Sequence, residues 1–286
     1  MSVDPGSVPI LATPAEMAAW SEEARARGQR VVFVPTMGAL HAGHVALLHE
    51  GRRRGERLVL SIFVNPTQFG PNEDLARYPR DLTGDLAKAA SAGADAAFVP
   101  AASVMYPPGA QTTVRVEKLE QGMCGDSRPN HFAGVATVVC KLFNIVRPHI
   151  AIFGEKDFQQ LAVIRRMVRD LDMPVEVVGH PTVREADGLA MSSRNAFLSS
   201  SDRARALSLS RGLFAARAAF EAGERDVAAL VAIARGHIEA GVDRVDYVDL
   251  RGAEDLEPLR RVDGAAVIAT AAFVGPTRLI DNVRLG

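Results

Sequence analysis

The stretch VPTMGALHAGHVALLHE, residues 34–50, contains the end of an apolar strand, a short loop and the start of a helix. His41 and His44 flank Gly43 at this corner, where neither imidazole can pack into a core. A helix N-terminus presents unpaired N–H groups and a partial positive charge, which suit it to bind phosphate. Imidazole N–H groups also donate to phosphate oxygens. The H-x-G-H spacing therefore favours an anion site, the alternative being one histidine that caps the helix beside a second that is solvated.

The same order of strand and helix repeats on both sides of this stretch. We predict strands over 30–35, 57–64, 94–99, 149–153 and 175–179, and helices over 14–28, 43–54, 81–92, 131–146 and 157–171. Short apolar strands that alternate with helices pair in parallel through right-handed crossovers. The sequence therefore predicts an α/β fold, a doubly wound, Rossmann-like parallel sheet. In such sheets ligands bind beyond the carboxyl ends of the strands.

The texture of the sequence changes near residue 184, where READGLAMSSRNAFLSS is small, polar and glycine-bearing, as in a mobile connector. Beyond it, apolar residues recur at helical spacing over 206–220 and 227–238, and 245–250 and 265–274 are strand-like. We therefore predict a Rossmann-like catalytic domain over 1–185 and a small α+β domain over 186–286. A small domain on such a connector can act as a lid.

Composition and charge limit the classes of partner. The net charge is −1, so no overall basic field attracts nucleic acid or an anionic membrane surface, and small molecules are the expected partners. We find no signal-peptide pattern and no apolar run of membrane-spanning length, so we expect a cytoplasmic protein. The two cysteines, Cys124 and Cys140, fit neither a disulfide framework nor a zinc site.

Amides follow two other predicted strands. In NPTQF, Pro66 turns the chain after the strand at 57–64 and directs Asn65 and Gln68 across the strand ends. Gln160 in DFQQL holds the matching place after another strand. An amide exchanges hydrogen bonds with a hydroxyl or a carboxylate without the desolvation penalty of a charge. The pattern predicts contacts to a polar substrate, the alternative being a turn asparagine and surface glutamines.

Two further segments place cations where an anion could bind. In FGEKDFQQL, Lys156 and Asp157 stand between a strand and a helix, so an ammonium group lies beside a helix N-terminus. In MSSRN, Ser192, Ser193 and Arg194 supply two hydroxyls and a guanidinium on the glycine-bearing connector. Both segments predict phosphate contacts. A surface lysine beside a capping aspartate and a helix-capping serine cluster are the alternatives.

Five motifs occur in this order: PTMGALHAGH, FVNPTQFGPNEDLARYPRD, SRPNHFAGVATVV, FGEKDFQQL and MSSRN. Together they resemble the pantothenate synthetases, the pantoate–β-alanine ligases of the HxGH nucleotidyltransferase superfamily. The resemblance covers nearly the whole predicted catalytic domain and the connector. It implies condensation of (R)-pantoate with β-alanine in coenzyme A biosynthesis, through a pantoyl adenylate, with ATP converted to AMP and pyrophosphate. It also implies a homodimer.

The resemblance further implies site residues at the matching positions, with the ATP and pantoate sites in residues 1–185. His44 is the implied proton donor, and Mg²⁺ is expected to bridge the phosphates. Asp85 is the candidate metal ligand, although Gly84 stands where relatives often have a second acid. The implied catalytic residues are His41, His44, Lys156 and Arg194, and the implied substrate residues are Asn65, Gln68 and Gln160. The implied ATP-binding residues are Met37, Gly38, Ala39, Leu40, His41, Ala42, Gly43, His44, Gly154, Glu155, Lys156, Asp157, Val183, Met191, Ser192, Ser193 and Arg194.

Two other functions remain compatible with the sequence. The first is another HxGH nucleotidyltransferase, which transfers an adenylyl or cytidylyl group to a phosphorylated substrate and needs no amine. The second is a nucleotide-binding regulator without turnover. The amides at the strand ends argue against a regulator, because a sensor needs no second substrate pocket.

Overall fold

The computed structural model describes residues 8–71 and 73–286. Contacts between residues divide the chain into two compact units, each assembled from separate stretches of sequence. The first unit takes in the described residues up to Val116, Pro129–Glu155 and Val163–Pro181, and the second takes in Glu117–Arg128, Lys156–Ala162 and Thr182–Gly286. The boundary between residues 185 and 186, and a lid role for residues 186–286, stay predictions.

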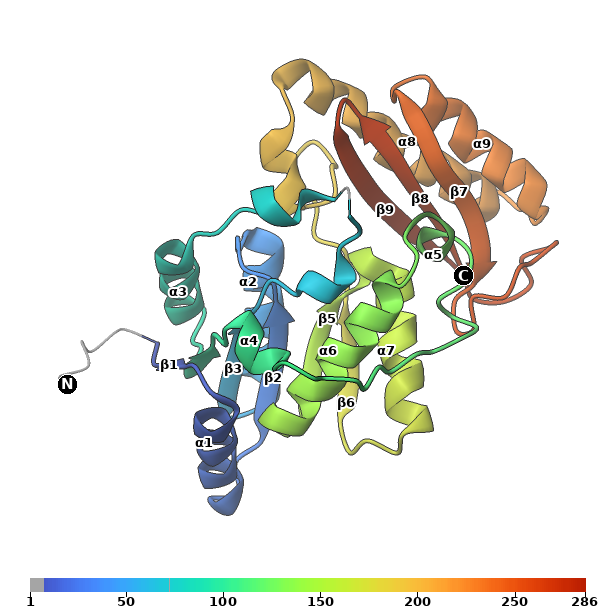
Figure 1. Cartoon of the computed structure of the whole chain (residues 1–286). Coiled ribbons are helices and arrows are strands. Elements are labelled where there is room, and N and C mark those ends of the chain that lie inside the picture. Colours follow the sequence, from blue (N-terminus) through green and yellow to red (C-terminus); the bar gives the residue numbers. More distant parts are fainter. Residues whose placement is uncertain (1–7, 72) are drawn as a thin grey trace. The chain divides into compact units, whose positions relative to one another are not determined.

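The first unit contains a six-stranded parallel sheet (Figure 1). Its strands are β1 (Ile10–Leu11), β2 (Val31–Thr36), β3 (Arg57–Ile62), β4 (Ala96–Phe98), β5 (Ile150–Gly154) and β6 (Glu176–His180). Their order is β1-β4-β3-β2-β5-β6, and every pair is parallel. The chain runs outward from β2 to β4 and then returns to β5 on the other side of β2. The predicted doubly wound fold is confirmed, and the strand order reverses between β2 and β5.

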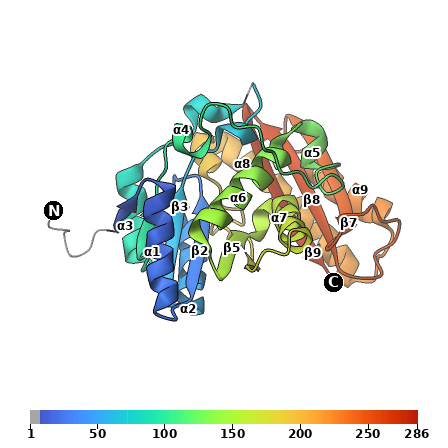
Figure 2. The ribbon, with the colours of Figure 1, turned by 60° about the horizontal axis from the view of Figure 1, so that its bottom comes forward.

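Helices cover both faces of this sheet. They are α1 (Pro14–Ala26), α2 (Ala42–Arg54), α3 (Leu82–Ser91), α4 (Ala102–Met105), α6 (His131–Val146) and α7 (Phe158–Asp170), with 3₁₀ turns η1 (Pro66–Gln68), η2 (Asp74–Arg77) and η3 (Glu155–Asp157). Helix α1 contacts α6 on one face, and α2 contacts α3 on the other (Figure 2). No helix in the described part of the chain is both long and apolar enough to cross a bilayer.

The core of the first unit explains why its strands read as continuous apolar runs. Val32 and Val34 of β2, Leu58 of β3 and Ile152 of β5 are fully buried, as strands covered on both faces must be. Helix α2 contributes Leu48 to the same cluster. The sheet is therefore a rigid base from which the loops at its carboxyl edge project.

A buried carboxylate holds the loop that follows β2. Gly38 and Ala39 both have positive φ, 84° and 51°, so this loop needs an external restraint. Asp85, in the first turn of α3, is 1% exposed, and its two carboxylate oxygens accept the N–H groups of Ala39 at 2.8 Å and Leu40 at 2.6 Å. Its charge is balanced by hydrogen bonds with two backbone amides. The loop of the quoted stretch is thereby anchored to a different crossover helix.

The second unit is a three-stranded antiparallel sheet with two helices. The sheet order is β7 (Arg244–Gly252), β8 (Ala266–Val274) and β9 (Thr277–Leu285). Helices α8 (Ser200–Glu221) and α9 (Val227–Glu239) pack on it, and the short η4 (Ser193–Phe197) and α5 (Cys124–Ser127) also belong to this unit. The predicted helices and the first two strands are confirmed, whereas β9 was not predicted. Its polar residues Arg278, Asp281, Asn282 and Arg284 interrupt the apolar pattern.

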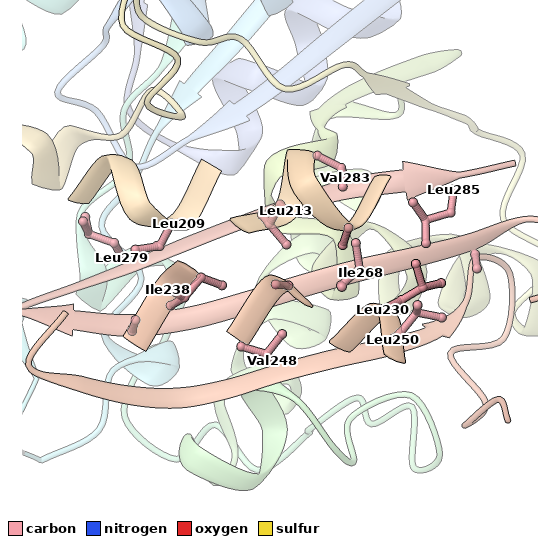
Figure 3. Packing of buried hydrophobic residues seen from close by; sticks show 14 of the residues in the cluster. Leu209, Leu213, Leu230, Ile238, Val248, Leu250, Ile268, Leu279, Val283 and Leu285 are labelled. Atoms are coloured by element: carbon pink, nitrogen blue, oxygen red, sulfur yellow. The ribbon is translucent and has the colours of Figure 1, made fainter. Parts of the chain in front are cut away.

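One apolar cluster joins these helices to the sheet (Figure 3). Leu209 and Leu213 of α8 and Ile238 of α9 pack against Ile268 of β8 and Leu279 of β9. Val283 and Leu285 belong to the same cluster, so the odd-numbered residues of β9 face the helices, and the even-numbered residues face away from them. The two faces of β9 therefore serve different neighbours.

A close approach in the first unit gives a stability prediction. A Cβ atom on Gly134 of α6 would lie 2.4 Å from the carbonyl oxygen of Thr67, whereas a Cβ on Gly236 of α9 would meet no atom within 4 Å. Gly134→Ala should lower the free energy of unfolding by about 1–3 kcal/mol through overpacking. Gly236→Ala, the matched control at an exposed helical position, should raise the free energy of unfolding by about 0.5–1 kcal/mol. Urea unfolding measures both values, and equal stabilisation by the two changes would refute the contact.

The Asp85 anchor gives a second prediction. Asp85→Asn keeps the size of the side chain but turns an N–H donor toward one of two backbone N–H groups, so it should cost about 1–3 kcal/mol. Asp81→Asn in the same helix is the control. Asp81 caps α3 by accepting the N–H of Gly84, and asparagine caps equally well. Hydrogen exchange at the Ala39 and Leu40 amides should accelerate only in Asp85→Asn; unchanged protection there would contradict the anchor.

Candidate active site

The topological switch point of the parallel sheet lies between β2 and β5. Open α/β sheets bind ligands at such points, beyond the carboxyl ends of the strands. The loop 37–41 leaves the carboxyl end of β2, and Gly154 ends β5. Glu155 follows it in η3. Residues predicted to bind the nucleotide thus occupy both strand exits at the switch point.

The two histidines of the quoted stretch, His41 and His44, together cap helix α2. His41 is the N-cap of α2, and its Nδ1 accepts the N–H of Gly43 at 3.1 Å. The Nδ1 of His44 accepts the N–H of His41 at 3.3 Å, which completes a capping box. The ring centroids lie 4.1 Å apart at 34°. Since each Nδ1 accepts a backbone N–H, the neutral rings carry their proton on Nε2. Helix capping and anion binding are therefore compatible roles for this pair. The hydrogen bonds that cap α2 leave the Nε2–H group of each imidazole as the donor.

The two substrate residues predicted after β3, Asn65 and Gln68, have different roles in the structure. Asn65 is buried, and its Oδ1 accepts from Thr67 and, at 2.8 Å, from the hydroxyl of Tyr106. Burial raises the pKa of Tyr106, so this hydroxyl stays a donor. The Nδ2 of Asn65 donates to Oε1 of Gln68 at 3.0 Å, and Nε2 of Gln68 lies 3.2 Å from Sδ of Met37. Asn65 therefore orients Gln68, which lies next to the loop after β2.

The carboxylate of Asp85, the candidate magnesium ligand, is engaged within the fold. Both oxygens of Asp85 already accept backbone N–H groups, and this carboxylate is buried. Within residues 8–71 and 73–286, no group of three histidine, cysteine, aspartate or glutamate side chains could hold a metal ion. The observed task of Asp85 is to hold the loop, and its role as a metal ligand stays a prediction with no geometry to support it.

In the second unit, the turn before α7 presents Lys156, and the first turn of α7 presents Gln160. The side chain of Lys156 is only 17% exposed, with Nζ 4.0 Å from Oδ2 of Asp157. Gln159 is buried and ties this segment to the 117–128 stretch, because its Oε1 accepts the N–H of Cys124 at 3.0 Å and its Nε2 donates to the carbonyl of Leu119 at 3.0 Å. Gln160 is half-buried. Of the two adjacent glutamines, Gln159 holds the fold, and Gln160 stays the predicted substrate contact.

The connector that carries MSSRN forms a hairpin held by hydrogen bonds. The N–H of Met191 donates to the carbonyl of Val183 at 3.0 Å, which closes a hairpin. Nδ2 of Asn195 donates to Oε1 of Glu185 at 2.7 Å, and Arg203 of α8 binds Oε2 of the same carboxylate at 2.7 Å. The guanidinium of Arg203 keeps the pKa of Glu185 below its usual value. These contacts stabilise the hairpin that leads into the predicted phosphate segment.

That phosphate segment begins with a serine cap. Oγ of Ser192 accepts the N–H of Arg194 at 3.2 Å and so starts η4, which contains Ser193 and Arg194. The alternative of a capping serine is therefore realised, but for this short turn rather than for α8. Ser199 caps α8 instead. The turn fixes the directions in which Ser193 and Arg194 leave the backbone.

Three residues with structural contacts to these segments were missed by sequence reasoning. They are Arg184, Asp281 and Asn282: Arg184 forms a two-point ion pair with Asp281, and Asn282 donates to the carbonyl of Lys156. The available signal was the Asp-Asn pair inside the apolar run LIDNVRL, where two polar residues interrupt a strand. Such an interruption indicates buried polar partners.

Comparisons with known proteins identify the family of this chain. The family model for pantoate-beta-alanine ligase matches residues 9–284. The pantothenate synthetase of Myxococcus xanthus is 56% identical over 280 residues, which cover 97% of this chain and 96% of that protein. The pantothenate synthetase of Geobacter sulfurreducens is 56% identical over 278 residues, 97% of this chain and 98% of that protein.

Solved structures extend the similarity to the fold. A crystal structure of pantothenate synthetase from Thermus thermophilus has a TM-score of 0.91 and 47% identity, and the match covers 96% of this chain and 99% of that one. A pantoate-beta-alanine ligase from Francisella tularensis, complexed with beta-gamma ATP and beta-alanine, has a TM-score of 0.80 and 31% identity over 97% of each chain. The resemblance found in the motifs is thus confirmed. The chain belongs to the pantoate-beta-alanine ligase family, and it is a ligase.

Proposed function

We propose that this chain condenses (R)-pantoate with β-alanine to give pantothenate, with ATP converted to AMP and pyrophosphate. The observation that carries the proposal is the adjacent pair His41 and His44, which caps α2 at the carboxyl end of β2. This pair combines a helix N-terminus with two oriented Nε2 donors, an arrangement suited to the phosphates of a nucleotide. The relative from Francisella tularensis, complexed with beta-gamma ATP and beta-alanine, supports these two substrates.

The chemistry explains why a nucleotide is needed. An amine does not usefully attack a carboxylate, because the leaving group would be oxide. The pantoate carboxylate therefore attacks the α-phosphorus of ATP, the bond to the bridging oxygen breaks, and pyrophosphate leaves. The amine of β-alanine then attacks the acyl carbon of the pantoyl adenylate, gives up a proton, and AMP leaves. No covalent bond to the protein is required.

Six side chains are assigned to the charge that accumulates on the leaving pyrophosphate. In the first unit, the Nε2–H groups of His41 and His44 donate hydrogen bonds, and the family resemblance assigns the role of proton donor to His44. In the second unit, the ammonium of Lys156 and the guanidinium of Arg194 supply positive charge, and the hydroxyls of Ser192 and Ser193 add neutral donors. Donors that are already in place before the reaction need no reorganisation when the charge develops. Each assignment stands on the geometry within its own unit.

The amides are assigned to pantoate. Gln68, oriented by Asn65, and Gln160 can exchange hydrogen bonds with the hydroxyls and the carboxylate of this acid. Asn65 acts mainly through Gln68, because its own donors and acceptor are engaged within the fold. Two glutamines at different strand exits give the site a polar character without a fixed charge.

Magnesium is proposed to arrive with the nucleotide. Mg²⁺ keeps several waters and binds phosphate oxygens with few protein ligands, which agrees with the engaged carboxylate of Asp85. No step above depends on it. A homodimer and a cytoplasmic location stay predictions from the family resemblance and the sequence.

The nearest alternative is another HxGH nucleotidyltransferase that acts on a phosphorylated substrate. One assay separates the two reactions: AMP release is measured from ATP and pantoate with and without β-alanine. The proposed ligase releases AMP in proportion to added β-alanine and forms pantothenate in equal amount. Absence of both products, with pyrophosphate released only when a phosphorylated acceptor is supplied, would favour the alternative, because that enzyme leaves the nucleotidyl group on its acceptor.

The histidine pair gives a prediction about rate. His44→Ala should reduce β-alanine-dependent AMP release about a hundredfold or more, since one preorganised donor contributes about 3 kcal/mol. His44→Asn keeps an acceptor for the N–H of His41 but lacks Nε2, so it should be equally slow although the cap is retained. His49→Ala, an exposed position on the same helix, is the control. A near-normal rate in His44→Asn would remove this Nε2 from the mechanism.

Gln160 of α7 gives a prediction about substrate binding. Gln160→Ala should raise the KM for pantoate about tenfold, as expected for the loss of one or two hydrogen bonds, and change the KM for ATP less than about twofold. Gln111→Ala, at an exposed position, is the control. Steady-state kinetics with each substrate varied in turn provides both constants. An unchanged KM for pantoate would defeat the assignment of Gln160.

A further inference from the structure

Two neighbouring residues of β9 carry buried polar side chains on opposite faces of the strand. Asp281 is 3% exposed and Asn282 is 5% exposed. Asp281 is odd-numbered, like Val283 of the apolar cluster, so it lies on the face of α8 and α9. Asn282 lies on the other face. Asn282 contacts the backbone of Lys156, which the proposed function assigns to the phosphates of ATP, and Asp281 contacts Arg184 in the hairpin that precedes the assigned turn Ser192–Arg194.

On the helix face, Asp281 holds the hairpin that leads to MSSRN. Nη1 of Arg184 lies 2.7 Å from Oδ2 of Asp281, and Nη2 lies 2.8 Å from Oδ1, a two-point ion pair. The same guanidinium donates to the carbonyl of Gly188 at the hairpin turn, 3.0 Å away. Arg184 also pairs with Ala190 across the hairpin. One ion pair therefore fixes both arms and the turn of the segment that precedes Ser192.

On the other face, Asn282 holds the segment before α7. Its Nδ2 donates to the carbonyl of Lys156 at 2.8 Å. Two residues along the same face, the guanidinium of Arg284 lies 5.4 Å from the centre of the Phe158 ring, a cation–π contact at the first residue of α7. The backbone of Lys156 is therefore set by β9 and not only by the end of β5.

The two anchors are also joined to each other. Nη2 of Arg184 donates to the carbonyl of Asn282 at 3.3 Å, and the N–H of Asn282 donates to Oδ1 of Asp281 at 2.7 Å. Burial raises the pKa of the Asp281 carboxyl, and Arg184 opposes this effect. A buried ion pair adds little stability over a well-packed apolar pair. We therefore assign the Arg184–Asp281 ion pair to orienting the hairpin rather than to stabilising the fold.

We propose that Asp281 and Asn282 are positioning residues that hold Lys156 and the Ser192–Arg194 turn in one register for the phosphates of ATP. This inference rests on the proposed function. The charged groups then meet the nucleotide already ordered, so less conformational entropy is lost on binding. Neither residue touches the substrate; Asp281 acts through Arg184 and the hairpin, and Asn282 acts through the backbone of Lys156.

The first test measures ATP binding directly by calorimetry on the full chain. Asn282→Ala should raise the dissociation constant for ATP about tenfold, the usual value of one hydrogen bond. Thr270→Val is the matched control, because Thr270 is buried in β8 and its Oγ1 donates to the carbonyl of Tyr247 at 2.9 Å. It removes one buried hydrogen bond from the same sheet and should leave ATP binding unchanged. Equal ATP affinity in Asn282→Ala and Thr270→Val would overturn the inference.

A double-mutant cycle shows through which residue Asn282 acts. If Asn282 acts through Lys156, the tenfold effect of Asn282→Ala should shrink to less than about twofold in a Lys156→Ala background. Full additivity of the two changes would contradict the positioning role. Should Asn282→Ala not fold, Arg184→Lys carries the test. It keeps the charge but cannot form the two-point pair, and it should weaken ATP binding by a similar factor.

The outcomes separate this inference from the proposed function. AMP release by the unaltered chain tests the ligase reaction through its dependence on β-alanine, whereas ATP affinity of the variants tests the positioning role. A chain that binds ATP but ignores β-alanine would defeat the proposed reaction and leave the positioning test intact. A β-alanine-dependent chain whose Asn282→Ala and Arg184→Lys variants bind ATP normally would defeat only the positioning role.

Discussion

The reversal of strand order beside β2 is the constraint on which the candidate site depends. Parallel strands need crossover helices, and the crossovers on the two sides of β2 run in opposite directions along the sheet. The loop that leaves β2 therefore has no crossover directly above it. In this loop, His41 and His44 satisfy the first backbone N–H groups of α2 with their Nδ1 atoms, and Asp85 satisfies the N–H groups before them. The hydrogen bonds that stabilise this loop and the start of α2 thus also orient the two imidazoles of the candidate site.

In both units, residues assigned to substrates are separated from residues that hold them. Asn65 orients Gln68, Gln159 supports the segment of Gln160, and Asp281 with Asn282 supports the segments of Arg194 and Lys156. The supporting side chains are buried and nearly saturated with hydrogen bonds, whereas the presented ones are half-buried. This division matches what catalysis by preorganised groups requires, since a donor contributes only when its own position is fixed.

Much of the fold could be predicted because periodicity is a local signal. The helix predicted over 131–146 agrees with the structure to the residue. The two-residue strand β1 is too short to show a period, and β9 was missed because its polar residues serve partners far away in sequence. The site motifs could be found because the residues of each motif are close together in the sequence. Asp85 and Asp281 were not recognised as anchors, because one sequence does not show which distant backbone groups a carboxylate meets.

The central claim is that the paired imidazoles of His41 and His44 after β2 bind the phosphates of ATP. A crystal structure of the chain with a non-hydrolysable ATP analogue and pantoate tests this claim most directly. The account predicts phosphate oxygens within hydrogen-bond distance of Nε2 of His41 and His44, with both Nδ1 atoms still bonded to backbone N–H groups. A nucleotide bound elsewhere, with both rings in contact with solvent alone, would contradict it.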